Sequence, residues 1–261
     1  MRMIASLTGT KLRSGKVLLA AYKLVKVSEM EADSPTLQCK LNNRLMKNKK
    51  TYYLLILDRS GSMSDCVNET IAGYNEQLQM IKDLQLRHPE QEFYVSLTTF
   101  NHMVEHPFSE INGEKLGELT RKNYVPDGMT ALLDAIGEGV MNLKARKAEE
   151  FRNDEATAVV VIMTDGHENA SRLFSKDAIR NMIRELEATD NWTFSFMGTT
   201  IDAIAVATDM NIRRENALHF EKKDMKSTMH RVAKEMQDYA HEKSKGNRVK
   251  DFLKEDPASK S

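Results

Sequence analysis

The sequence predicts an α/β fold: a doubly wound, mostly parallel β-sheet flanked by helices on both faces. Two observations predict it. Short apolar segments alternate along the chain with longer segments of helical periodicity, and most of the apolar segments are nearly continuous. Strands of that composition are buried on both faces, as in parallel sheets covered by helices. We also expect one short antiparallel edge strand, because residues 93–100 and 103–108 lie close enough along the chain to form a hairpin.

The expected strands are short runs of β-branched, aromatic and other apolar residues. They cover residues 52–57, 93–100, 103–108, 158–163, 192–197 and 217–220. The expected helices have apolar residues spaced three and four positions apart. They cover residues 68–86, 131–143, 177–186, 203–208 and 224–242. Pro89 lies just beyond the first of these helices, where proline commonly follows a helix end.

The composition of this 261-residue chain argues against several classes of partner. Its 38 basic residues balance its 38 acidic residues, so no net charge draws the protein to nucleic acid or to an anionic membrane. No apolar run reaches the roughly 20 residues that span a bilayer. Cys39 and Cys66 have no spacing typical of a disulfide framework or a zinc site, which favours a reducing compartment. We therefore expect a cytoplasmic protein, with its oligomeric state open.

One segment leaves a second location open. Residues 1–28 carry several basic residues and no acidic residue, a composition that is also compatible with an organellar transit peptide. The simpler interpretation is an N-terminal extension over residues 1–50 that packs on or beside one domain. The polar, charged segment over residues 243–261 is interpreted as a flexible tail.

The strongest functional signal is a set of oxygen-bearing residues beside the predicted strands. Asp58, Ser60 and Ser62 follow the first strand in one tight loop, Thr130 directly precedes a helix, and Asp165 follows another continuous apolar strand. Ligands of parallel sheets bind at the carboxyl ends of the strands. All five side chains are hard oxygen donors, which favours Mg²⁺, Mn²⁺ or Ca²⁺ over zinc or copper. The alternative is that these residues only form turns and helix caps.

Three motifs, Asp-x-Ser-x-Ser, Asp-Gly-Met-Thr-Ala-Leu and Thr-Asp-Gly, contain these residues in that order. Together they resemble the complete metal-ion-dependent adhesion site of von Willebrand factor type A (vWA) domains. The resemblance implies that Ser60, Ser62 and Thr130 contact the cation, and that Asp58 and Asp165 act directly or through water. It also implies that an Asp or Glu of a partner protein completes the coordination.

The resemblance covers about residues 51–242 and predicts a function. We expect a metal-dependent protein–protein interaction module, an adaptor or assembly factor rather than an enzyme. Arg59, Met63, Met129 and His167 are expected at the rim of the site, where the partner binds. Stand-alone intracellular prokaryotic and phage members of the family resemble accessory proteins of AAA+ ATPases or of stress and defence complexes, which suggests partners of those classes.

Two other functions stay open. A metal-dependent phosphotransfer or hydrolase enzyme could use the same loop, although phosphatases of the haloacid dehalogenase type carry a second aspartate where this chain has Ser60. Neither a Gly-x-Ser-x-Gly elbow nor a P-loop is present. The third function is a structural, oligomeric subunit that associates through a stripe on the last helix, although docking of that helix against the sheet is the simpler interpretation of the stripe. The stripe consists of Met225, Met229, Val232, Met236 and Tyr239.

Overall fold

The computed structural model describes residues 50–112, 117–245, 247 and 249–253. It contains the expected doubly wound α/β fold, with a six-stranded sheet in the order β3-β2-β1-β4-β5-β6. Neighbouring strands pair in parallel except β2 and β3, which are antiparallel. The strands are β1 (Lys50–Asp58), β2 (Glu92–Phe100), β3 (Val104–Asn112), β4 (Ala156–Thr164), β5 (Trp192–Gly198) and β6 (Ala217–His219). The predicted extension lies outside the described residues apart from Lys50, the first residue of β1.

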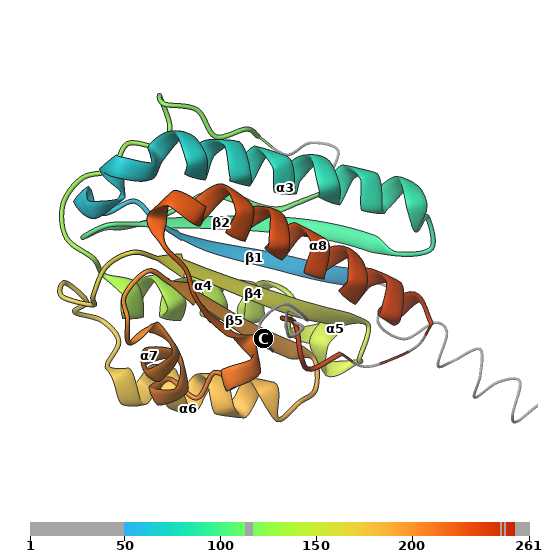
Figure 1. Ribbon diagram of the computed structural model, residues 1–261. Coiled ribbons are helices and arrows are strands. Elements are labelled where there is room, and N and C mark those ends of the chain that lie inside the picture. The colour runs from blue at the N-terminus through green and yellow to red at the C-terminus, as the bar shows by residue number, and fades with distance from the viewer. Residues whose placement is uncertain (1–49, 113–116, 246, 248, 254–261) are drawn as a thin grey trace, which may run out of the picture. The chain divides into compact units, whose positions relative to one another are not determined.

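Helices cover both faces of the sheet (Figure 1). On one face α3 (Val67–Arg87) and α8 (Met225–Ser244) lie side by side. On the other face lie α4 (Leu132–Arg146), α6 (Lys176–Glu187) and α7 (Ala203–Asp209). All five were predicted from their periodicity. No helix of the described residues is both long and apolar enough to cross a membrane.

Several one- or two-turn helices were not predicted. These are η1 (Gly61–Cys66), α5 (Ala148–Arg152), η3 (Arg214–Asn216) and η4 (Lys222–Asp224). Such helices are too short to show a repeating apolar pattern. Two of them, η1 and η4, carry residues that prove important at the site described below.

Alternate residues of β1 enter two separate hydrophobic cores. Tyr53 and Leu55 pack in the core beneath α3 and α8, whereas Tyr52 and Leu54 pack in the core beneath α4, α6 and α7. Each of the four is at most 5% exposed. A strand in this position must be apolar on both faces, which is why its sequence is a continuous apolar run.

The methionine-rich stripe of α8 faces into the first of these cores. Met225, Met229, Val232, Met236 and Tyr239 are each at most 5% exposed and pack with residues of α3 and the sheet. The stripe therefore serves the interior of the domain. Because the stripe is buried within the domain, it does not offer the surface through which a structural, oligomeric subunit was expected to associate.

Gly73 of α3 lies directly against Met229 of α8. A Cβ atom added there would lie 2.5 Å from the Cβ of Met229. We expect Gly73→Ala to lower the free energy of unfolding by about 1–2 kcal/mol, because overpacking costs about 1–3 kcal/mol. That cost exceeds the roughly 0.5–1 kcal/mol by which alanine is favoured over glycine within a helix. Urea denaturation measures the difference.

A matched variant separates packing from helix preference. Ala72→Gly, at the exposed position one residue earlier, should cost about 1 kcal/mol through helix preference alone. Replacing glycine by alanine at position 73 and alanine by glycine at position 72 should thus both lower the free energy of unfolding. A Gly73→Ala variant as stable as the parent would show that α8 can move away from α3 without loss.

The chain returns to the domain after α8. Phe252 and Leu253 are 1% and 4% exposed and belong to the core beneath α3 and α8. The buried side chain of Asn216 accepts a hydrogen bond from the Phe252 N–H at 2.7 Å and donates one to the Lys250 carbonyl at 2.9 Å. The prediction of a flexible tail from residue 243 is therefore wrong as far as Leu253, because two apolar residues anchor a mostly polar segment. Residues 254–261 lie outside the described part.

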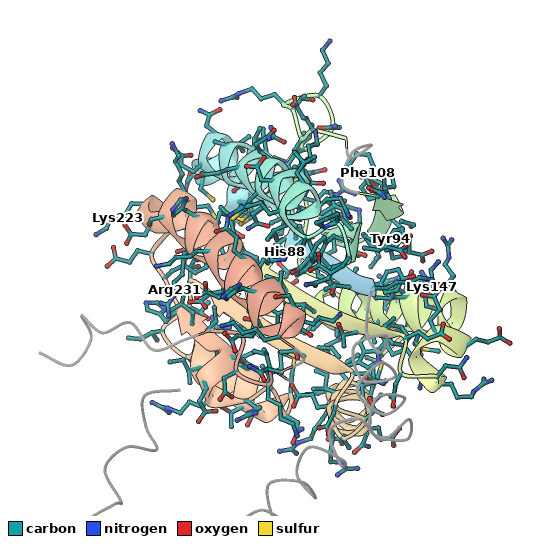
Figure 2. The ribbon with its side chains drawn as sticks, turned by 90° about the vertical axis from the view of Figure 1, so that its right-hand side faces the viewer. His88, Tyr94, Phe108, Lys147, Lys223 and Arg231 are labelled. Atoms are coloured by element: carbon teal, nitrogen blue, oxygen red, sulfur yellow. The ribbon has the colours of Figure 1, made fainter. Side chains whose placement is uncertain are left out.

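Aromatic and charged side chains, among them Tyr94 and Lys147, lie at the end of the sheet where the parallel strands begin (Figure 2). The ring of Tyr52 stacks on that of Tyr94 with centroids 5.2 Å apart, and the ammonium of Lys147 lies 5.4 Å from the Tyr52 ring centroid. The Tyr52 hydroxyl donates a hydrogen bond to Glu150 at 2.6 Å. These contacts join β1 and β2 to α5 and to Lys147, the residue between α4 and α5. The predicted functional residues lie at the opposite end.

Candidate metal centre

The predicted ligands meet at the carboxyl ends of β1 and β4. Asp58 is the last residue of β1, and Ser60 and Ser62 follow it at the start of η1. Thr130 lies two residues before α4, and Asp165 directly follows β4. In Figure 1 the η1 segment and the start of α3 lie at the left of the view. Parallel strands end at one edge of the sheet, so residues distant in sequence come together there.

Gly166 marks the point where three hydroxyl groups converge. A Cβ atom built on Gly166 would lie 2.9 Å from the Oγ1 of Thr130, 3.6 Å from the Oγ of Ser62 and 3.7 Å from the Oγ of Ser60. Hydroxyls from two different loops therefore border one small space. Any side chain at position 166 would enter that space.

Hydrogen bonds connect the hydroxyl groups to the two carboxylates. The Oγ atoms of Ser60 and Ser62 are 3.0 Å apart, and Ser62 donates to the Oδ1 of Asp165 at 2.6 Å. The Oδ1 of Asp58 accepts the Ser60 backbone N–H at 2.6 Å, and its Oδ2 accepts the Thr164 hydroxyl at 2.5 Å. Hydrogen bonds thus link four of the five predicted ligands, and the Thr130 hydroxyl borders the same space beside Gly166.

The cluster is enclosed except at one position. Asp58, Ser60, Thr130 and Asp165 are buried, whereas Ser62 is exposed. Burial raises the pKa of Asp58 to about 6. The hydrogen bonds from Thr164 and Ser60 lower this pKa without outweighing burial, and the nearby charge of Asp165 raises it further.

The structure places a positively charged side chain at the site, that of Lys222, which was not predicted. The Nζ of Lys222, the first residue of η4, lies 2.7 Å from the Oδ2 of Asp165 and donates a hydrogen bond to the Ser62 carbonyl at 2.6 Å. Burial lowers the pKa of Lys222, but the hydrogen bond and charge of Asp165 outweigh it, so this pKa lies above the ordinary lysine value. The available signal was topological: β6 is parallel to β5, so the residues after His219 emerge at the same edge.

A family model described as von Willebrand factor type A domain matches residues 54–255. The chain belongs to this family. A comparison of the vWA sequence with curated proteins found no match. The family's Rossmann-like fold agrees with the strand order and the helices on both faces of the sheet described above.

Solved structures similar to this vWA domain come from several sources. They include the PilB minor pilin of Streptococcus sanguinis, with a TM-score of 0.51, 14% identity, and coverage of 74% of this chain and 62% of that one. Proximal thread matrix protein 1 from the mussel byssus, described with a zinc-occupied MIDAS motif, has a TM-score of 0.49 and 15% identity. The match covers 74% of this chain and 46% of that one. Manganese-loaded TRAP protein of Plasmodium vivax has a TM-score of 0.46 and 17% identity, and the match covers 69% of this chain and 72% of that one. At these identities the likeness concerns the fold alone, and the chain spans less than half the length of the mussel protein.

The helix-cap alternative does not account for the hydroxyl residues of this vWA domain. The residue that caps α4 is Ala131 rather than Thr130, and Ser60 makes no side-chain capping bond to η1. Thr130 is instead held by Asn169, whose Oδ1 accepts the Thr130 N–H at 2.9 Å and whose own N–H donates to the Thr130 carbonyl at 3.0 Å. The hydroxyl of Thr130 is thereby fixed toward the space beside Gly166.

The four predicted rim residues have different positions. Met129 is 53% exposed and His167 is exposed, so both lie where a partner can reach them. The guanidinium of Arg59 pairs with Glu105 at 2.6 Å, and its side chain is only 12% exposed. The prediction for Met63 is wrong: it is 0% exposed, because the turn of η1 directs it into the core beneath α3 and α8.

The chemistry of the donors decides which metal the site suits. Among the described residues no group of three or more His, Cys, Asp or Glu is placed to hold an ion. The candidate site has two carboxylates and three hydroxyls instead. An all-oxygen set of this kind fits a hard divalent cation such as Mg²⁺, Mn²⁺ or Ca²⁺.

Proposed function

We propose that this vWA domain is a divalent-metal-dependent protein–protein interaction module that acts as an adaptor or assembly factor. The observation that carries the proposal is the convergence of three hydroxyls beside Gly166, where the two serine hydroxyls bond each other and Ser62 donates to Asp165. In this proposal Ser60, Ser62 and Thr130 hold the cation, and Asp58 and Asp165 neutralise it and orient water. When bound, the cation supplies an open coordination position for an acidic side chain of the partner.

Two features of the chain preorganise this arrangement. Asp58 fixes the loop that carries both serines through its bonds to the Ser60 N–H and the Thr164 hydroxyl. Asn169 fixes Thr130 on the other side of the space. Positioning by such surrounding bonds reduces the loss of side-chain freedom when a ligand binds. The proposal assigns no catalytic step to the chain.

The surface around the site suits a protein partner. A groove of about 660 Å³ next to Thr130 is lined by residues that include Met103, Met129 and Leu173, which are 53%, 53% and 71% exposed. Ile201, in the loop after β5, is 96% exposed. Scattered exposed apolar residues are ordinary, but several gathered around one site indicate an interaction surface. We infer a partner whose Asp or Glu is flanked by apolar side chains.

We propose two classes of partner: an AAA+ ATPase, or a stress or defence complex. In either case we propose that the protein and its partner meet in the cytoplasm. Binding of either would be expected to depend on the same five side chains. A chelator should therefore release the partner.

Thermal unfolding tests the metal site directly. A cation at 100 times its dissociation constant stabilises the folded state by about 2.7 kcal/mol, which should raise the melting temperature by about 5–10 °C. We expect this rise when Mg²⁺, Mn²⁺ or Ca²⁺ replaces chelator in the parent, and no rise in the Ser60→Ala/Ser62→Ala variant. Differential scanning calorimetry measures both.

Ser64→Ala is the matched control. Ser64 lies in the same short helix, but its hydroxyl bonds the Gly61 carbonyl instead of the cluster. This variant should respond to cations as the parent does. A double variant that responds fully would place the ion elsewhere, and a parent that responds to none of the three cations at millimolar concentration would contradict the proposal.

A further inference from the structure

The ammonium of Lys222 is built into the candidate metal site. It lies 2.7 Å from the Oδ2 of Asp165 and donates to the Ser62 carbonyl at 2.6 Å. The Asp165 side chain is 0% exposed, whereas that of Lys222 is 33% exposed. The contact is therefore between an enclosed carboxylate and a lysine that reaches in from the edge, unlike an ordinary ion pair between two solvated side chains.

Other charges near Lys222 do not replace this contact. Asp65 lies 3.9 Å from the ammonium, but its side chain is 84% exposed and solvent screens it. The neighbouring Lys223 turns away and pairs with Glu221 at 2.7 Å. Asp165 is thus the closest carboxylate to Lys222, and the next residue supplies a lysine that lacks the contact.

The charge balance of the site depends on Lys222. Asp58 and Asp165 together carry two negative charges, which would neutralise a divalent cation. The ammonium of Lys222 returns one positive charge to the site, so the same cation would be left with a net charge of plus one. A site with that balance attracts an external carboxylate, whereas a neutral one does not.

We propose that Lys222 determines the specificity of the site: by neutralising Asp165, it weakens cation binding and strengthens the attraction of the bound cation for an anionic partner. This inference rests on the proposed function and goes beyond the five oxygen ligands. Asp165 keeps both oxygens engaged, Oδ1 by the Ser62 hydroxyl and Oδ2 by Lys222. Its capacity to neutralise the cation is therefore shared with a side chain of the chain itself.

The inference predicts two effects of opposite sign in Lys222→Met. Affinity for Mn²⁺, measured by isothermal titration calorimetry, should rise about tenfold, because unit charges a few ångströms apart still interact strongly near a protein surface. Affinity of the Mn²⁺-loaded protein for acetate should fall several-fold. Acetate binding is measured by the decrease in the relaxation rate of water protons, because the carboxylate replaces a water molecule bound to Mn²⁺.

Three further variants complete the design. Lys222→Arg keeps the charge and should bind both probes within about threefold of the parent. Lys223→Met removes the same charge one residue away, without contact to Asp165, and should leave both affinities unchanged. Urea denaturation establishes that each variant is folded. If Lys222→Met does not fold, Lys222→Gln removes the charge but retains donors for Asp165 and Ser62.

The outcomes separate this inference from the proposed function. Tighter Mn²⁺ binding with weaker acetate binding supports the inference. Mn²⁺ binding by the parent that Lys222→Met does not improve overturns the inference and leaves the metal site intact. Unchanged acetate affinity overturns the role toward the partner. If the parent binds none of Mn²⁺, Mg²⁺ and Ca²⁺, the inference and the proposed function both fail.

Discussion

Asp58→Asn is expected to make the protein more stable in chelator at pH 7.5 and to remove its response to divalent cations. Asp58 is 0% exposed, and burial raises its pKa from 3.8 to about 6. At pH 7.5 the parent must therefore hold a buried charge, which the asparagine lacks. The pKa shift corresponds to a cost of about 3 kcal/mol in the free energy of unfolding at pH 7.5. We expect the free energy of unfolding of the variant to exceed that of the parent by about 1–3 kcal/mol.

The hydrogen bonds around Asp58 allow this substitution. The Ser60 N–H can still donate to the asparagine Oδ1. The Thr164 hydroxyl now donates to Asp58, but it also lies 3.3 Å from the Gly166 carbonyl. It can donate there and accept from the new amide instead. The substitution thus removes a charge without leaving a buried donor unpaired, the condition under which such changes are tolerated.

The pH dependence follows from the direction of the shift. An acid whose pKa is higher in the folded than in the unfolded state contributes stability below its unfolded pKa and loses it as the pH rises through the folded pKa. For Asp58 that window runs from about pH 4 to about pH 6. In chelator, the stability of the parent should fall across this window relative to that of Asp58→Asn.

Urea denaturation of both proteins from pH 4 to 7.5, with chelator throughout, measures the difference. Asp127→Asn is the control, because Asp127 is an exposed carboxylate in the loop before Thr130. It should change neither the stability nor the response to cations appreciably. An Asp58→Asn variant less stable than the parent at pH 7.5 would show that the carboxylate stabilises the fold even without a metal.

This opposition between stability and binding explains why Asp58 could be recognised in the sequence as a candidate site residue. An aspartate at the end of a continuous apolar strand is costly for folding alone, so its presence at Asp58 indicates a function. Continuous strands also predicted the parallel sheet, and the parallel sheet placed Asp58 and Asp165 at one edge. These inferences depend on local patterns and on one topological rule.

What could not be predicted depends on contacts between distant segments. Lys222 reaches Asp165 only because β6 ends beside β5 and η4 turns toward η1. Met63 turns inward because η1 coils immediately after Ser60. Phe252 is anchored by Asn216, a residue in a three-residue helix. None of these contacts leaves a periodic pattern in the sequence.

Asp134→Ala is expected to lower the free energy of unfolding by about 3 kcal/mol or more. Asp134 lies in the first turn of α4 and is 6% exposed. Its carboxylate accepts the backbone N–H groups of Arg172, Leu173 and Phe174 at 2.8, 2.9 and 2.9 Å. Each hydrogen bond to a charged group contributes about 1.5–3 kcal/mol. The same loop carries Asn169, which holds Thr130, so cation affinity should fall as well.

The size of the loss distinguishes two roles for this carboxylate. An acid that only interacts favourably with the helix dipole contributes about 0.3–1 kcal/mol, and replacing it by asparagine or alanine would then cost about the same. An anchor of the loop predicts a graded series instead. Asp134→Asn keeps the Oδ1 that serves Leu173 and Phe174 but loses the Oδ2 that accepts from Arg172. It should therefore lose about 1–2 kcal/mol in urea denaturation, clearly less than alanine. Equal and small losses for the two variants would leave Asp134 with only its interaction with the helix dipole, and the loop beside the metal site would need another anchor.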